Sequence, residues 1–467
     1  MFVLKFGTKP LPSQYMLQYN YDNLIMMRKR ALYLLPFVLC LLPLTIHAQE
    51  VYDLKRCLEI ALEKNYDIRI IRNEQQIAKN NATAGNAGLL PSLDLNAGYS
   101  GTLSNTNSDN TDGTTTKTGD VLNQGANLGL NLQWTVFDGF SMQTNYKRLR
   151  EFEAMGEINT RLTVENRIAD LTAEYYNYVR QNLRLANLKS AVALSKERLR
   201  IVEARYTIGS MSRLDLQQAR VDFNADSSNL IRQYETLYTS QVTLNRLMAV
   251  DDVSQSIELT DSLINPNPNL QKELLWTSAL QSNSSLLLSA KNQTISELDY
   301  KNLRSRNYPY LRLNAGYGYT LNTYGSGSPK RQDNLGFNYG FTLGFSIFDG
   351  FNRQREQRNA RITIQNQKLQ FEQLELSLKA DFVNMWMAYR NNLDLIALEE
   401  ENLEAAKENY EIAIERYKLG DLAGIELREA QNSLLGAEER LLQAQFDTKL
   451  CEISLLQISG QIGSYLE

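Results

Sequence analysis

The chain has 467 residues, of which 43% are hydrophobic and 22% charged, and its formal net charge is −4. With 25 glycines and only 9 prolines, it is an ordered chain long enough for two or three domains or one elongated body. This slightly acidic balance gives no sign of the basic stripe that a nucleic-acid surface needs, so we expect no nucleic-acid partner.

The first 48 residues are expected to be an upstream extension followed by a secretory signal peptide. Basic residues 28–30 precede an apolar run over 31–46, and the small residue Ala48 follows it. This order is typical of a signal peptide, and the run is too short for a convincing membrane-spanning helix. Its removal would take away His47, the only histidine. We therefore expect no enzyme activity, no cofactor and no metal site.

The remainder is an internal duplication, because three motifs recur in the same order. They are Pro-Ser-Leu-Asp-Leu-Asn-Ala-Gly-Tyr at 91–99 and its variant at 309–317, Phe-Asp-Gly-Phe at 137–140 and 348–351, and Arg-Tyr-x-x-Gly at 205–209 and 416–420. Ordered matches of this kind indicate two structural repeats. We expect repeat 1 over residues 49–250, a connector over 251–270 and repeat 2 over 271–467.

Each repeat contains two segments in which apolar and polar residues alternate strictly. They cover 91–104 and 125–137 in repeat 1, and 309–321 and 335–348 in repeat 2. Alternation predicts strands whose two faces meet different environments. Their length and aromatic content are typical of transmembrane barrel strands, while half-buried hairpins of a soluble domain are the alternative. On the barrel interpretation, the residues expected to face lipid are Leu130, Trp134, Phe341 and Phe345.

Polar stretches join the two strands of each repeat. Residues 101–124 and 322–334 consist mostly of Thr, Asn, Ser, Asp and Gly. We expect both stretches to be solvated loops on the outer side of the membrane, where barrels place their longer loops.

The rest of each repeat is predicted to be helical. Residues 140–208 lack proline, and residues 351–419 lack both proline and glycine. A helix of that length is about 100 Å long and must pack lengthwise against neighbours. Shorter helices are expected at about 67–89 and 285–307.

Two glycines mark the points where the long helices reverse. Gly209 and Gly420 are followed by return helices over about 212–249 and 424–460, and a capping box at Ser212 begins the first of them. The resulting antiparallel hairpins would span residues 140–249 and 351–460.

The four strands of one chain cannot close a barrel, because a sheet edge facing lipid is not tolerated and the smallest membrane barrels have about eight strands. The strands are therefore expected to be shared between chains. Two copies would give a barrel filled by side chains, whereas three would give twelve strands and room for a passage.

Several of these motifs resemble those of the TolC-like outer-membrane efflux proteins. The similarity is carried by the segment Leu54-Lys-Arg-Cys-Leu-Glu-Ile-Ala-Leu-Glu-Lys-Asn65, by the Phe-Asp-Gly turns and by the Arg-Tyr-x-x-Gly tips. It runs from about residue 52 to the C-terminus.

The resemblance implies an α+β membrane protein that works as a homotrimer, with a twelve-stranded barrel in the outer membrane and a helical tunnel in the periplasm. It implies an exit duct for a proton-driven or ATP-driven inner-membrane pump, joined through a periplasmic adaptor, the membrane fusion protein. The alternative is a secreted structural or adhesive coiled-coil protein that does not enter a membrane.

The resemblance also implies a gate just behind the hairpin tips, where a tyrosine of one hairpin bonds an aspartate of the other. The matching positions are Tyr417, three residues before Gly420, and Asp215, six residues after Gly209. The two glycines are the expected adaptor-docking tips. The alternative is that Asp215 only caps its helix.

Two acidic residues complete the expected gate. Glu426 and Glu429 follow the second tip where relatives commonly have aspartates, and their i, i+3 spacing puts them on one helix face. In a trimer they would form a ring of carboxylates that favours cations. The chain departs from the best-known pattern at Leu422, where an arginine can add to the lock, and at the uncharged Gln218. An ordinary solvated face is the alternative for the two glutamates.

Overall fold

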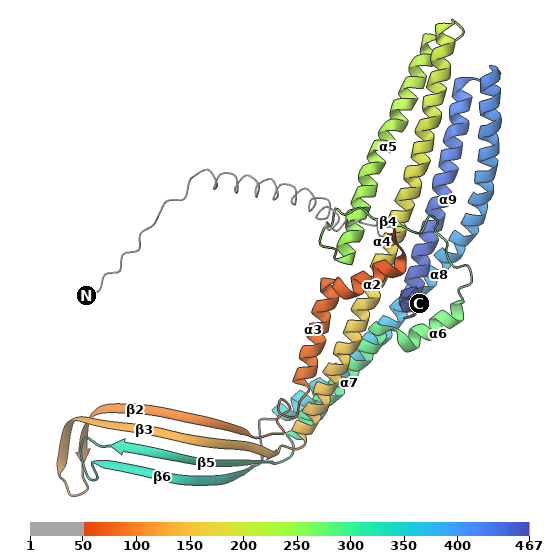
Figure 1. Ribbon diagram of the computed structural model, residues 1–467. Helices are drawn as coiled ribbons and strands as arrows, with labels where there is room; N and C mark the ends of the chain where they lie inside the picture. Colours follow the sequence, from red (N-terminus) through yellow and green to blue (C-terminus); the bar gives the residue numbers. More distant parts are fainter. Residues whose placement is uncertain (1–50, 467) are drawn as a thin grey trace, which may run out of the picture. The chain divides into compact units, whose positions relative to one another are not determined.

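The structure is a computed structural model in which residues 51–466 are described. The upstream extension and signal peptide expected over residues 1–48 lie outside the described residues. Residues from Tyr52 onward form one unit, and its elements are labelled in Figure 1.

The same order of elements, helix, helix, strand, strand, helix, helix, occurs twice along this unit. The first set is α2 (Leu54–Lys64), α3 (Tyr66–Asn81), β2 (Ser92–Asp109), β3 (Thr115–Phe137), α4 (Ser141–Thr207) and α5 (Arg213–Met248). The second set is α6 (Lys272–Ser282), α7 (Ser284–Ser305), β5 (Tyr310–Thr323), β6 (Arg331–Gly344), α8 (Asn352–Leu419) and α9 (Gly424–Ile458). The remaining elements are the short strands β1 (Val51–Tyr52) and β4 (Glu258–Leu259) and the 3₁₀ helix η1 (Ile462–Leu466).

The long helices α4 and α8 have 67 and 68 residues, so each is about 100 Å long. Helix α5 packs along α4, α9 packs along α8, and the two hairpins meet where α4 packs against α9 (Figure 1). Ser212 begins α5 with a capping box: its Oγ accepts from the Asp215 N–H at 3.2 Å, and the Asp215 carboxylate accepts from the Ser212 N–H at 3.2 Å. This pairing satisfies two backbone groups that a helix start otherwise leaves open.

The helix expected over residues 67–89 is shorter than predicted, because α3 ends at Asn81. Two glycines follow within seven residues, and Gly88 adopts a left-handed φ of 87° that a helix cannot contain. The Asn86 side chain also donates to the Asn81 carbonyl at 2.9 Å, which ends the helix. The left-handed backbone at Gly88 and the side-chain contact of Asn86 therefore end α3 before the predicted boundary at residue 89.

The four long strands form one antiparallel sheet in the order β2-β3-β5-β6. The stretch over residues 101–124 was predicted to be a loop, but most of it is strand: Ser108 pairs with Thr116, and only residues 110–114 join the two strands. Threonine is favourable in exposed β-strands, so the polar composition of this stretch did not justify predicting a loop. In repeat 2 the connection is likewise shortened, to residues 324–330.

Strand β6 ends at Gly344, before the boundary at residue 348 that alternation predicted. Phe345 is therefore not part of the sheet, although its side chain is exposed. The neighbouring strand explains this end: its first paired residue is Tyr310, and the preceding Pro309 has no N–H to continue the ladder. The Tyr310 ring also occupies the space beside Gly344 that any larger side chain would need.

Each Phe-Asp-Gly-Phe motif forms the turn from strand to long helix. The two residues that follow Asp138, and the two that follow Asp349, have left-handed φ between 64° and 71°. Each aspartate accepts from a backbone N–H four residues later, Met142 at 3.1 Å and Arg353 at 3.0 Å. The motif thus reverses the chain and caps the helix at once.

The main hydrophobic core lies where α2, α4, α5, α8 and α9 approach the connector. Its largest fully buried side chains are Leu58, Leu171, Tyr175, Leu244, Met248, Ile264, Phe382, Tyr389 and Leu455. A smaller core near the hairpin tips contains Val202, Leu216, Ala219, Ala413, Tyr417, Leu427 and Ala430. Between these two cores polar contacts also join the hairpins, among them Arg428 with Asp226 and Arg184 with Glu439.

Candidate functional site: the sheet faces and the hairpin tips

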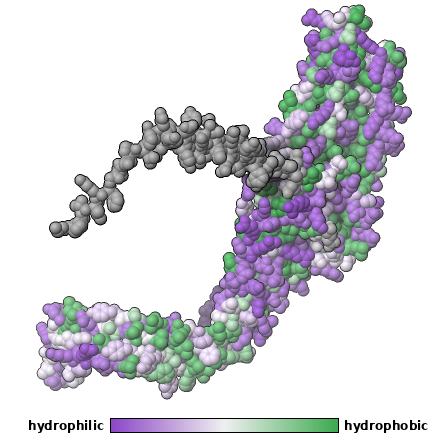
Figure 2. Space-filling view, viewed as in Figure 1, coloured by the Kyte–Doolittle hydropathy of each residue, from purple (hydrophilic) through white to green (hydrophobic). Residues whose placement is uncertain are grey.

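The apolar side chains of all four strands share one face of the sheet. The register places Leu130 beside Tyr317, and Trp134 beside Leu313, which in turn lies beside Phe341. These side chains are exposed: the fraction accessible is 44% for Leu130, 39% for Trp134 and 75% for Phe341. Figure 2 shows hydrophobic residues spread along the sheet. An apolar surface of this extent requires lipid or another protein chain to cover it.

The opposite face of the sheet is lined by asparagines and glycines. The Asn127 Oδ1 lies 2.6 Å from where a Cβ at Gly98 would stand, and the Asn338 amide fills the equivalent space at Gly316. Each amide therefore lies flat over a glycine of the next strand. The result is a polar and largely uncharged surface, which suits contact with water.

The two hairpin tips are open. Gly209 and Gly420 have left-handed φ of 78° and 87°, and a Cβ at either position would meet nothing within 4 Å. The left-handed backbone that the sequence predicted at both glycines is confirmed, since this conformation ends a helix most easily at glycine.

The two residues of the expected lock, Tyr417 and Asp215, line the same cavity of about 370 Å³ between the hairpins. They are not hydrogen-bonded within this chain. The Asp215 carboxylate accepts from the Ser212 hydroxyl at 2.7 Å, and the buried Tyr417 hydroxyl has no partner among the described residues. Burial raises the pKa of Tyr417, so the hydroxyl stays protonated and able to donate.

Arg205 makes the contact between hairpins that lies nearest the tips. Its guanidinium donates at 2.9 Å to the carbonyls of Tyr417 and Lys418, and its Cζ lies 5.2 Å from the centre of the Tyr417 ring. A positive charge near the last turn of a helix is favourable. Arg205 places such a charge at the end of α8, although it belongs to the hairpin of α4 and α5. Arg205 belongs to the first Arg-Tyr-x-x-Gly motif, so the sequence motif marked this residue but did not reveal which groups it contacts.

Sequence reasoning also missed a buried ion pair between the hairpins. Arg428 of α9 donates to both carboxylate oxygens of Asp226 of α5, at 2.6 and 2.8 Å. Ser195 of α4 also bonds this carboxylate, and Gln431 donates to the Ser195 hydroxyl at 3.3 Å. A two-pronged contact of this kind is among the stronger charge-assisted hydrogen bonds.

A second buried pair lies one turn away but stays within one hairpin. Arg198 of α4 bonds Asp222 of α5, and the Gln218 amide donates to the other oxygen of Asp222 at 3.0 Å. Gln218, noted as a departure from the familiar lock, therefore supports this pair. The pairing of charges across packed helices depends on their relative register, which a single sequence does not reveal.

Glu426 and Glu429 are both exposed and line one shallow depression beside Arg416. The Glu426 carboxylate also accepts from the Ala423 N–H at 3.4 Å, at the start of α9. The sequence placed the two glutamates on one helix face, and the structure puts them there. Arg416 itself pairs with Asp421 at 3.2 Å, which leaves both glutamates without an ion pair among residues 51–466.

The structure offers little chemistry beyond these contacts. Within residues 51–466, no group of three or more His, Cys, Asp and Glu side chains could hold a metal ion. Cys57 and Cys451 are free and buried, and burial raises the pKa of the Cys57 thiol to about 12, far from a reactive thiolate. None of the helices described is long and apolar enough to cross a membrane.

A family model described as "Outer membrane efflux protein" matches residues 57–250 and 275–461, most of the chain. Among curated proteins, "Outer membrane protein TolC" of Vibrio cholerae is 21% identical over 412 residues, covering 87% of this chain and 90% of the relative. "Outer membrane efflux protein BepC" of Brucella suis is 20% identical over 335 residues, covering 72% of each chain.

Solved structures with the same fold include two bacterial outer membrane proteins. VceC of Vibrio cholerae has a TM-score of 0.71 at 18% identity, with 87% of this chain and 96% of that chain covered. The CmeC outer membrane channel of Campylobacter jejuni has a TM-score of 0.73 at 17% identity, with 87% and 85% covered. At these identities the likeness shows a shared fold.

Proposed function

Since the chain belongs to the outer membrane efflux protein family, we propose that it is the exit duct of a tripartite efflux or type I secretion system. In this role it resides in the outer membrane with its helices in the periplasm. It passes substrates from an inner-membrane pump, joined through a periplasmic adaptor, to the exterior. Because the role is conduction, it requires neither a cofactor nor a catalytic group.

The observation that carries this proposal is the four-stranded sheet with one exposed apolar face. Strands β2 and β6 form its edges, and neither has a further partner among the described residues. Closing the sheet with copies of itself removes both edges and turns the apolar face toward lipid. Three copies supply twelve strands, whose inner face is then the neutral layer of asparagine and glycine.

A stripe on α8 supports assembly from several copies. Ile362, Leu369, Leu376 and Val383 recur at every seventh position and are exposed. A heptad of exposed apolar side chains on a long helix favours packing against another long helix. We propose that a neighbouring copy supplies that helix, which makes the assembly a homotrimer with a closed ring of hairpins.

A secreted adhesive or structural protein is the weaker alternative. It would leave the apolar sheet face in water, where a continuous apolar surface drives aggregation. The duct instead gives each face of the sheet a suitable environment.

We place the gate at the hairpin tips. In the assembled duct, the Tyr417 hydroxyl and the Asp215 carboxylate form the lock between hairpins, and Glu426 and Glu429 form a ring of carboxylates near the axis. Two observations support this: Tyr417 has a donor without a partner, and it shares a cavity with Asp215. The open tips at Gly209 and Gly420 are where an adaptor helix docks.

The whole proposal is tested by purifying the protein from membranes and measuring its mass and its conductance. We expect it in the outer-membrane fraction, as a trimer by light scattering in detergent, and conducting ions in planar bilayers. A monomer that remains soluble without detergent would contradict both the barrel and the duct.

A further inference from the structure

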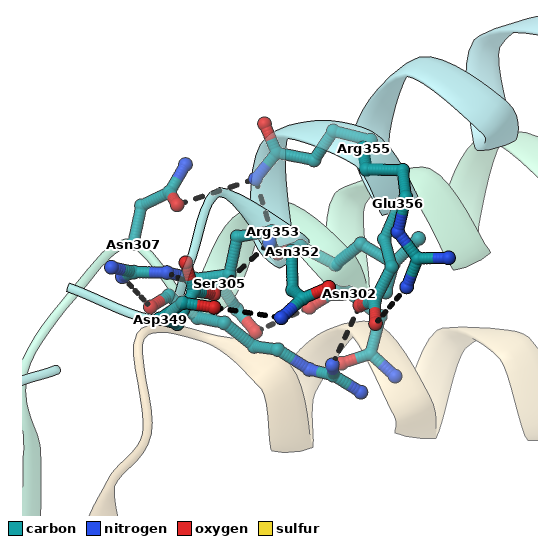
Figure 3. A network of polar contacts seen from close by, with 11 residues as sticks. Asn302, Ser305, Asn307, Asp349, Asn352, Arg353, Arg355 and Glu356 are labelled. Carbon is teal, nitrogen blue, oxygen red and sulfur yellow. Dashed lines mark hydrogen bonds and ion pairs between the residues drawn. The ribbon is translucent and has the colours of Figure 1, made fainter.

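The junction between the sheet and α8 carries a group of exposed arginines, which we call the arginine patch: Arg304, Arg355, Arg358 and Arg361. It overlaps the network in Figure 3, where the end of α7 meets the start of α8 and Arg355 approaches Glu356. That network already contains the arginines that hold the junction together. The patch consists of the arginines that make no ion pair shorter than 3.9 Å, Arg355 among them.

Two nearby arginines have clear structural roles. Arg353 is mostly buried and donates to the Asp349 carboxylate at 3.0 Å, to the Arg306 carbonyl at 3.0 Å and to the Ser346 carbonyl at 2.8 Å. Arg306 pairs with Glu356 at 2.9 Å. These contacts tie the turn to α7, as the dashed lines of Figure 3 show.

The arginines of the patch are not balanced in this way. The Arg304 and Arg361 guanidiniums both lie near Tyr300, 6.0 and 5.4 Å from the centre of its ring. Arg361 also donates to the Tyr300 hydroxyl from Nε and from one terminal nitrogen, at 3.0 and 2.8 Å. Two like charges therefore share one neutral side chain. Neither has an ion pair among the described residues. Arg358 also lacks one, and Arg355 approaches only Glu356, at 3.9 Å, which Arg306 already binds.

The fold itself does not need this charge. The first turn of α8 has no acidic residue, and the helix macrodipole disfavours the positive charge of Arg355 there. Arg304 instead lies in the last turn of α7, where the macrodipole favours a cation. In repeat 1 the residue that corresponds to Arg361 is Arg150, which pairs with Glu153 at 2.7 Å. The position that matches Glu153 is Ile364 in repeat 2. The same turn therefore forms in repeat 1 with its arginine neutralised.

Exposed aromatic side chains lie at the same junction. Phe348 and Phe351 are 71% and 62% exposed and contact each other edge to face at 5.3 Å. They follow directly on the apolar face of the sheet. Aromatic rings at the end of an apolar band, followed by basic side chains, are the pattern of a membrane–water boundary.

We propose that the arginine patch binds the phosphate groups of anionic glycerophospholipids in the membrane leaflet that faces the helices. This rests on the proposed insertion of the sheet in a membrane. A guanidinium can donate two parallel hydrogen bonds to a phosphate. Arg361 retains the N–H groups that do not point at the Tyr300 hydroxyl, and Arg304 beside the same ring adds a second guanidinium. Phe348 and Phe351 then lie at the depth of the glycerol backbone.

The test compares two lipids that differ only in charge. Phosphatidylglycerol or phosphatidylcholine with identical acyl chains is added to the detergent-solubilised protein, and retained lipid is counted by native mass spectrometry. We expect severalfold more phosphatidylglycerol on the wild type. Since each basic residue near an anionic surface changes partitioning about fivefold, R355Q/R358Q/R361Q should lose this preference.

A matched control removes the same charge farther along the same helix. Lys379, Arg390 and Lys407 are exposed residues of α8, and K379Q/R390Q/K407Q should retain the preference. If the triple patch variant does not assemble, R304Q alone should lower the preference without abolishing it. Equal retention of the two lipids by the wild type would overturn the proposal, as would equal loss in the control.

Two further measurements distinguish lipid binding from phosphate binding and from a failure of the proposed duct. Excess inorganic phosphate should leave the preference in place, and its loss would reassign the patch to free phosphate. Planar-bilayer conductance is measured on the same preparation. If the protein conducts ions but shows no lipid preference, the proposed lipid binding is wrong and the proposed duct stands. If it shows the lipid preference but does not conduct, the proposed duct is wrong and the lipid binding stands.

Discussion

At the scale of single residues, the charges that join the hairpins are not those that the family pattern names. The Arg428–Asp226 pair is more buried than the Asp215 carboxylate, and it directly links α5 to the second hairpin. Tyr417 is buried beside it with a free hydroxyl. The tip region thus combines a bond that is already made with a donor that is still available.

Asp226→Asn should destabilise the tip region. The change leaves the half-buried Arg428 without its charged partner, and breaking one side of a buried pair typically costs about 3–5 kcal/mol. We expect a lower thermal midpoint by circular dichroism and a higher mean conductance, because the hairpins separate more easily. Asp222→Asn breaks a buried pair within one hairpin, so it should lower the midpoint without raising conductance. Equal conductance gains in both variants would show that hairpin separation is not involved.

Tyr417→Phe separates the lock from simple packing. The hydroxyl has no partner among the described residues, so its loss should change the free energy of unfolding by no more than about 0.5 kcal/mol. If the lock forms on assembly, Tyr417→Phe combined with Asp215→Ala should raise conductance in planar bilayers. Unchanged conductance would remove both residues from the gate and leave Asp215 as a helix cap.

At the scale of elements, the sequence predicted the long helices and the existence of the strands well. Absence of proline and the tip glycines define α4, α5, α8 and α9, because those signals act locally. The prediction failed where contacts with other segments of the chain determine the structure. Strand pairing extends β2 and β3 through a polar stretch at residues 101–124, and Pro309 ends β6 early by withholding a hydrogen bond. The Arg428–Asp226 contact escaped prediction for the same reason, since it depends on how two hairpins align.

The two faces of β3 give a sharp test of the sheet's environment. Leu130 lies on the apolar face and Asn131 on the polar face of the same strand. Leu130→Asp should reduce the amount of assembled protein in the outer membrane, because a buried charge at mid-bilayer costs up to about 2–4 kcal/mol for basic residues and less for acidic ones. Phe341→Asp should act in the same way.

Asn131→Asp is the control for that change, since it adds the same charge to the water-filled side. Assembly is followed by heat-modifiable migration on gels and by membrane fractionation. If both β3 variants assemble equally well, the apolar face does not contact lipid. That result would favour the alternative of a secreted adhesive or structural protein.

At the scale of the whole molecule, symmetry turns modest features of one chain into strong ones. In the proposed homotrimer, the four strands of each chain would close into one barrel, and two unpaired glutamates per chain would become six carboxylates around one axis. The neutral asparagine–glycine face of the sheet contributes almost no field of its own. Charge selectivity of the duct should therefore arise at the periplasmic tips and not in the barrel.

This places the final prediction at Glu426 and Glu429. A ring of six carboxylates favours cations and should be blocked by a trivalent cation such as lanthanum, with block weakening as salt rises. Glu426→Ala with Glu429→Ala should abolish block in planar bilayers and lower cation selectivity. Glu408→Ala with Glu411→Ala removes the same exposed charge at the same spacing from α8 and should leave block intact. Persistent block in the first double variant would mean that these glutamates are an ordinary solvated helix face, and that the constriction lies elsewhere along the hairpins.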